Sequence, residues 1–199
     1  FAGFNPRILP EQREIPFLFL ANIHPALQNS VLDQMHRPRY TVLDTMNLWI
    51  TTQREALLRV LRRVDLAVLN DQEVRLLTGI TSLARAARQV RSWGPKTVIV
   101  KKGEHGALVV GSEGSFLTHA VPLEKVIDPT GAGDSFAGAL VGCLAAAGRT
   151  DFAALRRAMA ENPYLHLMVQ SGYYDGGTDY FNAKYSMWNL DPAGRLQDR

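Results

Sequence analysis

Short apolar runs rich in β-branched residues recur along the first half of the chain, and polar residues bound each of them. Runs of this length predict strands that are buried on both faces of a sheet. They lie at 17–22, 41–45, 66–70 and 97–102. Between them, apolar residues recur at helical spacing, as at 54–64 and 82–93. Strands that alternate with helices predict an α/β fold, with a mostly parallel sheet covered by helices.

The alternation changes after Lys102. Two apolar runs, 106–112 and 115–121, are separated only by Glu113 and Gly114, and such spacing predicts an antiparallel hairpin. The predicted sheet is therefore parallel at first and antiparallel at its end.

Polar residues follow the predicted parallel strands. In open α/β sheets, ligands bind beyond the carboxyl ends of the strands. Asn22, Asp44 and Asn70 fall at such ends, so this edge of the sheet is the expected ligand-binding edge.

Residues 128–134 read DPTGAGD and precede a small-residue helix expected at about 133–147. Gly131 and Gly133 allow the backbone to turn sharply and to approach a ligand closely. The helix start offers unpaired N–H groups and a positive dipole end, which suit a phosphate. Asp134 falls in the first helical turn. An isolated Asp there is usually a capping acid, but beside an anion-binding loop it suits a general base for phosphoryl transfer.

Composition and charge narrow the function classes. The chain has 199 residues with a net charge of +3, and its Arg residues are scattered instead of forming one basic block, so we expect no nucleic-acid partner. The one cysteine, Cys143, excludes an internal disulfide. No apolar run reaches membrane-spanning length and no cationic leader is present, so we expect no membrane association and a cytoplasmic location.

The stretch DPTGAGDSFAG at 128–138 resembles the C-terminal signature of the PfkB (ribokinase-like) family of carbohydrate kinases. Other stretches resemble the same family in the same order, over about residues 1–155: LDTMNLWI at 43–50, the N-x-x-E of 70–73 with LLTG at 76–79, and VIVKKGEHGALV at 98–109. The resemblance implies a ribokinase-like three-layer sandwich, with helices on both faces of the sheet. It also implies ATP- and Mg²⁺-dependent phosphorylation of a hydroxyl on a sugar or sugar-like alcohol.

The resemblance also implies roles for individual residues. Asp134 would be the catalytic base, and Asn70 with Glu73 would organise magnesium and phosphates; the ordinary alternative for that pair is a strand-end Asn and a helix N-terminal Glu. Lys101 stands where the family often has a hydroxyl residue, which leaves its role open. The full implied set is Asp134 as base, Gly131, Ala132 and Gly133 as anion hole, and Asn70, Glu73, Lys101, Gly103, Gly106 and Asp128 on the nucleotide and magnesium side.

Family members are considerably longer than this chain. Their first part supplies the start of the sheet, a small β-lid and most sugar contacts, so we expect residues 1–155 to be a kinase domain truncated at its N-terminus. This expectation leaves three points open: the activity of the chain, its acceptor and a homodimeric assembly. The alternative function is a non-catalytic nucleotide-binding or structural domain.

Residues 156–199 resemble a C-terminal fragment of the serine carboxypeptidase family, with Asp175 in SGYYDGGT as the acid. We therefore expect a chimera of two families. A remote alternative function is hydrolysis by Ser135, because GDSFAG at 133–138 resembles a nucleophile elbow. That fold orders its triad Ser, acid, His, but all five histidines precede Asp175, so no complete triad is expected.

Overall fold

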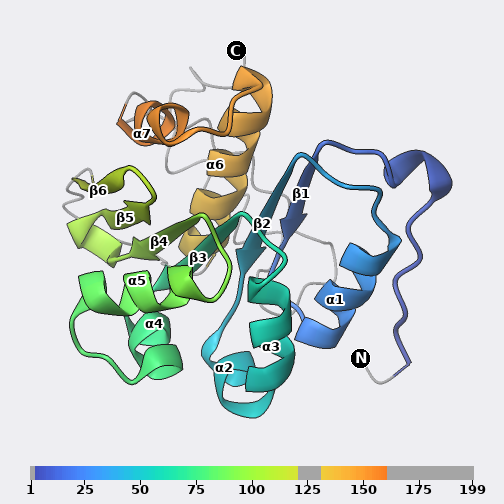
Figure 1. Ribbon diagram of the computed structural model, residues 1–199, viewed down its shortest axis with the longest axis horizontal. Helices are drawn as coiled ribbons and strands as arrows, with labels where there is room; N and C mark the ends of the chain where they lie inside the picture. Colours follow the sequence, from blue (N-terminus) through green and yellow to red (C-terminus); the bar gives the residue numbers. More distant parts are fainter. Residues whose placement is uncertain (1–2, 121–130, 161–199) are drawn as a thin grey trace, which may run out of the picture.

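A computed structural model describes residues 3–120 and 131–160 of the chain. Its centre is a six-stranded sheet whose strands are ordered as in the sequence (Figure 1). The first four strands are mutually parallel, and the last two are antiparallel to their neighbours. The strands are β1 (Phe17–Leu20), β2 (Tyr40–Asp44), β3 (Leu66–Asn70), β4 (Thr97–Lys101), β5 (Ala107–Gly111) and β6 (Gly114–Thr118).

Helices cover both faces of this sheet, which gives three layers. One face carries helices from the first half of the chain, and the other carries α6 and α7 (Figure 1). The helices are α1 (Pro25–Gln34), α2 (Asn47–Thr52), α3 (Arg54–Leu61), α4 (Asp71–Thr78), α5 (Leu83–Ser92), α6 (Ala132–Ala147) and α7 (Phe152–Ala160), with 3₁₀ turns η1 (Pro10–Gln12) and η2 (Gly103–His105).

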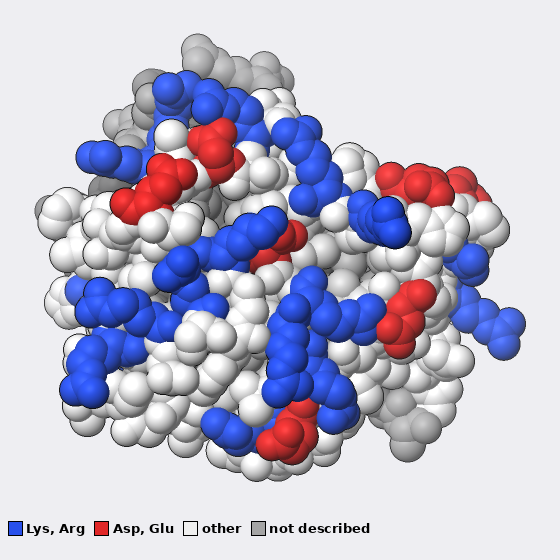
Figure 2. Space-filling model, in the orientation of Figure 1, with Lys and Arg blue, Asp and Glu red and all other residues white. Residues whose placement is uncertain are grey.

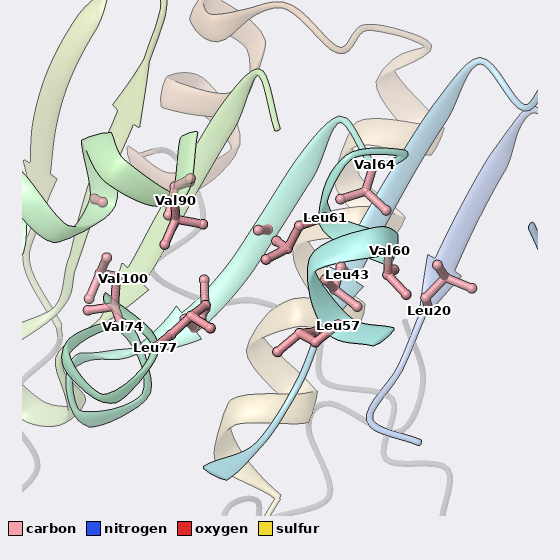
Figure 3. Packing of buried hydrophobic residues seen from close by; sticks show 14 of the residues in the cluster. Leu20, Leu43, Leu57, Val60, Leu61, Val64, Val74, Leu77, Val90 and Val100 are labelled. Atoms are coloured by element: carbon pink, nitrogen blue, oxygen red, sulfur yellow. The ribbon is translucent and has the colours of Figure 1, made fainter. Parts of the chain in front are cut away.

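The core is divided by the sheet into two apolar clusters, because successive residues of a strand point to opposite faces. In β3, Ala67 and Leu69 pack toward α3 and α4, whereas Leu66 and Val68 pack toward α6. Figure 3 shows the first cluster, in which Leu57 and other apolar residues of α3 lie against the sheet. Burial on both faces explains why the strands are almost continuously apolar.

The predicted α/β fold is confirmed, including the parallel strands and the antiparallel hairpin. The hairpin turn differs by one residue: Gly114 pairs with Gly111, so the turn consists of Ser112 and Glu113. Helices α1 and α2 were not expected, because their apolar residues lack a clear helical period. Helix α7 crosses the boundary between residues 155 and 156, and the suggested division of the chain there stays a prediction.

Charged side chains are distributed over the surface. Figure 2 shows Lys and Arg groups spread across one face, with Asp and Glu groups between them. None of the helices in the described part of the chain has the length and apolar character that crossing a membrane requires.

Candidate active site

Three neighbouring parallel strands end in polar residues at one edge of the sheet. Asp44 is the last residue of β2, Asn70 of β3 and Lys101 of β4. Asn70 and Lys101 are register partners, so their side chains emerge from adjacent positions. This is the edge at which open α/β sheets bind ligands.

Asp44 is a buried carboxylate that lies beside the ammonium of Lys101. Only 3% of its side chain is exposed, and its Oδ2 lies 3.5 Å from Nζ of Lys101, whose side chain is 17% exposed. Burial raises the pKa of Asp44, and the ammonium of Lys101 and the N–H of Thr45 partly offset that rise. A buried charge of this kind is costly, and perturbed carboxylates at a sheet edge are typical of functional sites.

The backbone around Asp44 is anchored from α1. The side-chain amide of Gln28 donates to the carbonyls of Ala21 and Asp44, at 2.9 and 3.2 Å, and so ties together the segments that follow β1 and β2. The hydroxyl of Thr45 is buried and has no hydrogen-bond partner within the described residues. Such an unsatisfied buried hydroxyl beside a buried carboxylate is consistent with a polar ligand at this edge.

Asn70 and Glu73 form a capping box at the start of α4. The side chain of Asn70 accepts from the N–H of Glu73 at 2.8 Å, and the carboxylate of Glu73 accepts from the N–H of Asn70 at 2.6 Å. The two residues therefore have a structural role: they cap the helix, as the alternative of a strand-end Asn and a helix N-terminal Glu implies. Burial nevertheless raises the pKa of Glu73, and the hydrogen bond from Asn70 and the charge of Lys101 offset it only in part.

Helix α6 begins close to these strand ends. Its N-cap, Gly131, has a φ of +76°, a left-handed conformation that a residue with a side chain adopts at a cost. Asp134 is the third residue of the helix and is exposed. Its charge contributes to the raised pKa of both Asp44 and Glu73.

Lys101 connects the strand ends to α6. Its Nζ lies 2.9 Å from the point where a Cβ on Gly133 would stand, so the ammonium lies directly over the backbone of the helix start. Any side chain at position 133 would have to displace it. The long stem of Lys101 thus brings one positive charge between the carboxylate of Asp44 and the predicted anion hole.

The structure brings most of the predicted site residues together. Asn70, Glu73, Lys101, Gly133 and Asp134 share this edge, with Gly131 and Ala132 in the same loop and helix start. Asp128 lies outside the described residues.

Gly103 and Gly106 lie further along, around η2, and have positive φ angles of 57° and 81°. A Cβ on Gly106 would stand 1.9 Å from the carbonyl oxygen of Thr118, so the approach of β6 already explains that glycine. The sequence places Asp44 at the expected ligand-binding edge, because it ends a predicted strand, but assigns it no role in the site. The signal lacking from the sequence is its contact with Lys101, which is 57 positions away.

The remote alternative of a serine nucleophile has no support in the described residues. Ser135 is half-buried in the first turn of α6, and its N–H donates to the carbonyl of Gly131. Within 3–120 and 131–160, no hydrogen bond joins its hydroxyl to a histidine. Asp175 and the rest of the carboxypeptidase-like segment lie outside the described residues.

Residues 31–160, well over half of the chain, match the family described as pfkB family carbohydrate kinase. The chain belongs to this family. The match includes Asp44, Asn70, Glu73 and Lys101 at the strand ends, as well as the start of α6. Its fold is accordingly the ribokinase-like α/β fold.

The chain is similar to parts of several known kinases. The chain is 34% identical to a cytidine kinase from Thermococcus kodakarensis over 60% of this chain and 44% of that protein. The crystal structure of aminoimidazole riboside kinase from Salmonella enterica matches with a TM-score of 0.63 and 26% identity, over 78% of this chain and 59% of that one. A putative ribokinase II from E. coli in complex with ATP and Mg²⁺ matches in fold, with a TM-score of 0.58 and 24% identity, over 87% of this chain and 59% of that one. The chain spans about half or less of the length of the curated relatives it matches.

Magnesium is the metal that this pfkB site implies. Within the described residues, no group of three or more His, Cys, Asp or Glu side chains is arranged to hold a metal ion. Mg²⁺ is commonly bound through one or two carboxylates together with substrate phosphates, so a complete protein cage is not required. The oxygen atoms of Glu73 and Asn70 are ligands of the kind that this ion prefers, and they fit such a shared site.

Proposed function

We propose that this chain carries the transfer site of an ATP-dependent kinase that phosphorylates a hydroxyl of a sugar or sugar-like substrate. The observation that carries the proposal is the position of Asp134. Its exposed carboxylate lies in the first turn of α6, and its charge acts on Asp44 and Glu73 at the strand ends. In this proposal an acceptor hydroxyl and a phosphate meet at the same helix start.

Asp134 is the general base in this proposal. Its carboxylate takes the proton of the acceptor hydroxyl, whose oxygen then attacks the terminal phosphorus of ATP. The bond between that phosphorus and the bridging oxygen breaks, and ADP leaves with the electron pair. An exposed carboxylate suits the role, because a small acceptor must reach it directly.

The start of α6 binds the charge that develops on the transferred group. Gly131, Ala132 and Gly133 have backbone N–H groups at a helix N-terminus, where no preceding turn accepts their hydrogen bonds. Donors that are already oriented need no rearrangement in the transition state. The glycine at 131 supports this arrangement, because its left-handed conformation is that of the N-cap at which the helix begins.

In this proposal Asn70 and Glu73 serve the nucleotide and magnesium side, together with Gly103 and Gly106 from the segment that follows β4. When bound, Mg²⁺ neutralises negative charge on the phosphates. The capping box holds the Glu73 carboxylate in one orientation. Asp128 belongs to the same set by resemblance.

Two measurements on the same preparation test the proposal. ATP binding is titrated by calorimetry with Mg²⁺ present, and ADP release is followed in a coupled assay across a panel of sugars and nucleosides. Binding with acceptor-dependent ADP release supports the kinase. Binding without release for any acceptor supports a non-catalytic nucleotide-binding domain, and no binding at all contradicts both.

A further inference from the structure

Among the described residues, Lys101 has no partner that satisfies its charge fully. Within the described residues its one hydrogen-bonded contact is the 3.5 Å approach to Asp44. Charge-assisted N–H to carboxylate bonds are typically about 2.7–2.9 Å long, so this contact is a weak one. An ammonium has three donors. A lysine whose side chain is only 17% exposed therefore keeps donor capacity that this contact does not use.

The ammonium also lies where a phosphate is expected to bind. It stands over the Gly133 backbone, at the N-terminus of a 16-residue helix. Its charge acts on Glu73 as well as on Asp44, so it is central to the cluster. The ammonium of Lys101 thus lies at the predicted anion hole, whereas the resemblance groups Lys101 with the nucleotide and magnesium side.

We propose that Lys101 contacts the phosphoryl group that is transferred, and that Asp44 is the positioning residue that holds the ammonium over Gly133. The inference rests on the proposed kinase function and deepens it. The buried carboxylate of Asp44 draws the lysine stem across the strand ends without saturating its donors. The terminal phosphate of ATP then completes the coordination of the ammonium, and the anion hole gains a full positive charge.

The preference for ATP over ADP is the measurement that separates this role from a structural one. ADP lacks the terminal phosphate, so loss of a contact to that phosphate weakens ATP binding while it changes ADP binding much less. In Lys101→Met, which keeps most of the unbranched side chain and removes the ammonium, we expect the ATP-to-ADP affinity ratio to fall about tenfold or more. A lysine that only supports the fold would change the two affinities equally.

Lys96→Met is the matched control. It removes the same charge just before β4, at the opposite end of the strand, from a side chain that is 78% exposed and paired with Asp65. We expect its affinity ratio to equal that of the parent. Lys101→Gln is the second variant with the same expected loss, in case Lys101→Met does not fold.

The positioning role of Asp44 is tested by a double-mutant cycle on the same ratio. Asp44→Asn removes a negative charge that repels phosphate, and this benefit acts whether or not Lys101 is present. Only with Lys101 present does it also release the ammonium. We therefore expect Asp44→Asn to raise the ATP-to-ADP affinity ratio less, or to lower it more, in the parent than in the Lys101→Met background.

The outcomes distinguish the two levels of the proposal. If the parent binds no ATP, the proposed function itself fails. If the parent binds ATP but the ratio is unchanged in both folded Lys101 variants, the phosphate contact is wrong and the kinase proposal stands. If the ratio falls but the cycle shows no coupling, the role assigned to Asp44 is wrong.

Discussion

Nζ of Lys101 lies 2.9 Å from the position that a Cβ on Gly133 would occupy. One residue ends β4 and the other begins α6, so the contact links the sheet to the helix start. Gly133 thus leaves room for a cation as well as for a phosphate. This relationship changes the expected effect of a substitution at position 133.

Gly133→Val is expected to weaken ATP binding about tenfold or more with little loss of stability. Among the described residues, the added Cβ meets the flexible end of Lys101, which moves away at small cost to the fold but leaves the anion hole. Calorimetric titration gives the affinity and thermal unfolding gives the stability. Gly138→Val is the control: it lies on the same helix, and no described residue comes within 4 Å of its Cβ position. Equal ATP affinity in the two folded variants would contradict the anion hole.

Asp134→Asn is expected to leave ATP affinity nearly intact while turnover falls about 10²–10⁴-fold, the usual effect of losing a general base. The change keeps the shape of the side chain and removes its ability to take a proton. Steady-state assays with the best acceptor of the panel measure it. Asp33→Asn, at an exposed carboxylate on α1 that pairs with Arg63, is the control for the loss of one charge. Parental turnover in Asp134→Asn would show that Asp134 is not the base.

Asn70→Ala is expected to destabilise the fold by about 0.5–2 kcal/mol, because it removes the side-chain cap of α4. Asn70→Ser keeps a capping oxygen and should restore most of that loss, as urea unfolding would show. The two variants also separate structure from function. If Asn70 organises the phosphates, both weaken ATP binding. If Asn70→Ser binds ATP as the parent does, the residue is only a helix cap.

Gly106→Ala is expected to cost more stability than Gly103→Ala. Both glycines have positive φ, which costs a residue with a side chain about 1–2 kcal/mol. At position 106 the new Cβ also collides with the backbone of Thr118, whereas position 103 has open space around it. Urea unfolding of both variants measures the difference. Equal losses would mean that the approach of β6 does not explain the glycine at 106.

Asp44→Asn is expected to change the pH dependence of stability. Burial raises the folded-state pKa of Asp44 above its ordinary value of 3.8, so the folded protein holds this proton more tightly than the unfolded chain. The associated stability is present below the ordinary value and is lost as pH rises through the folded-state pKa. The variant lacks this loss, so its stability relative to the parent should rise from about pH 4 toward neutrality.

Unfolding free energies measured at several pH values test this expectation, with Asp33→Asn as the control that should show no such rise. A stability difference that stays constant or falls over this range would contradict the raised pKa. A rise would also show that the site lowers stability at neutral pH, as functional clusters of buried carboxylates often do.

Much of the fold was predictable because it depends on local patterns. The apolar runs at 66–70 and 97–102 predict buried strands by composition alone, and both strands form. The helix start at Asp134 follows from the glycines before it, which act within a few residues. Helix α2 escaped prediction, because six residues are too few to show a helical period.

The sequence by itself determined which residue types stand at the strand ends and at the start of α6, because strand and helix signals are read over short windows. Only the tertiary structure decided which of them meet. Asp44 and Lys101 are 57 positions apart, and they pair because β2, β3 and β4 are neighbours in the sheet and end at one edge. Strand order and the placing of α6 depend on burying two apolar faces at once, and no local window contains that requirement.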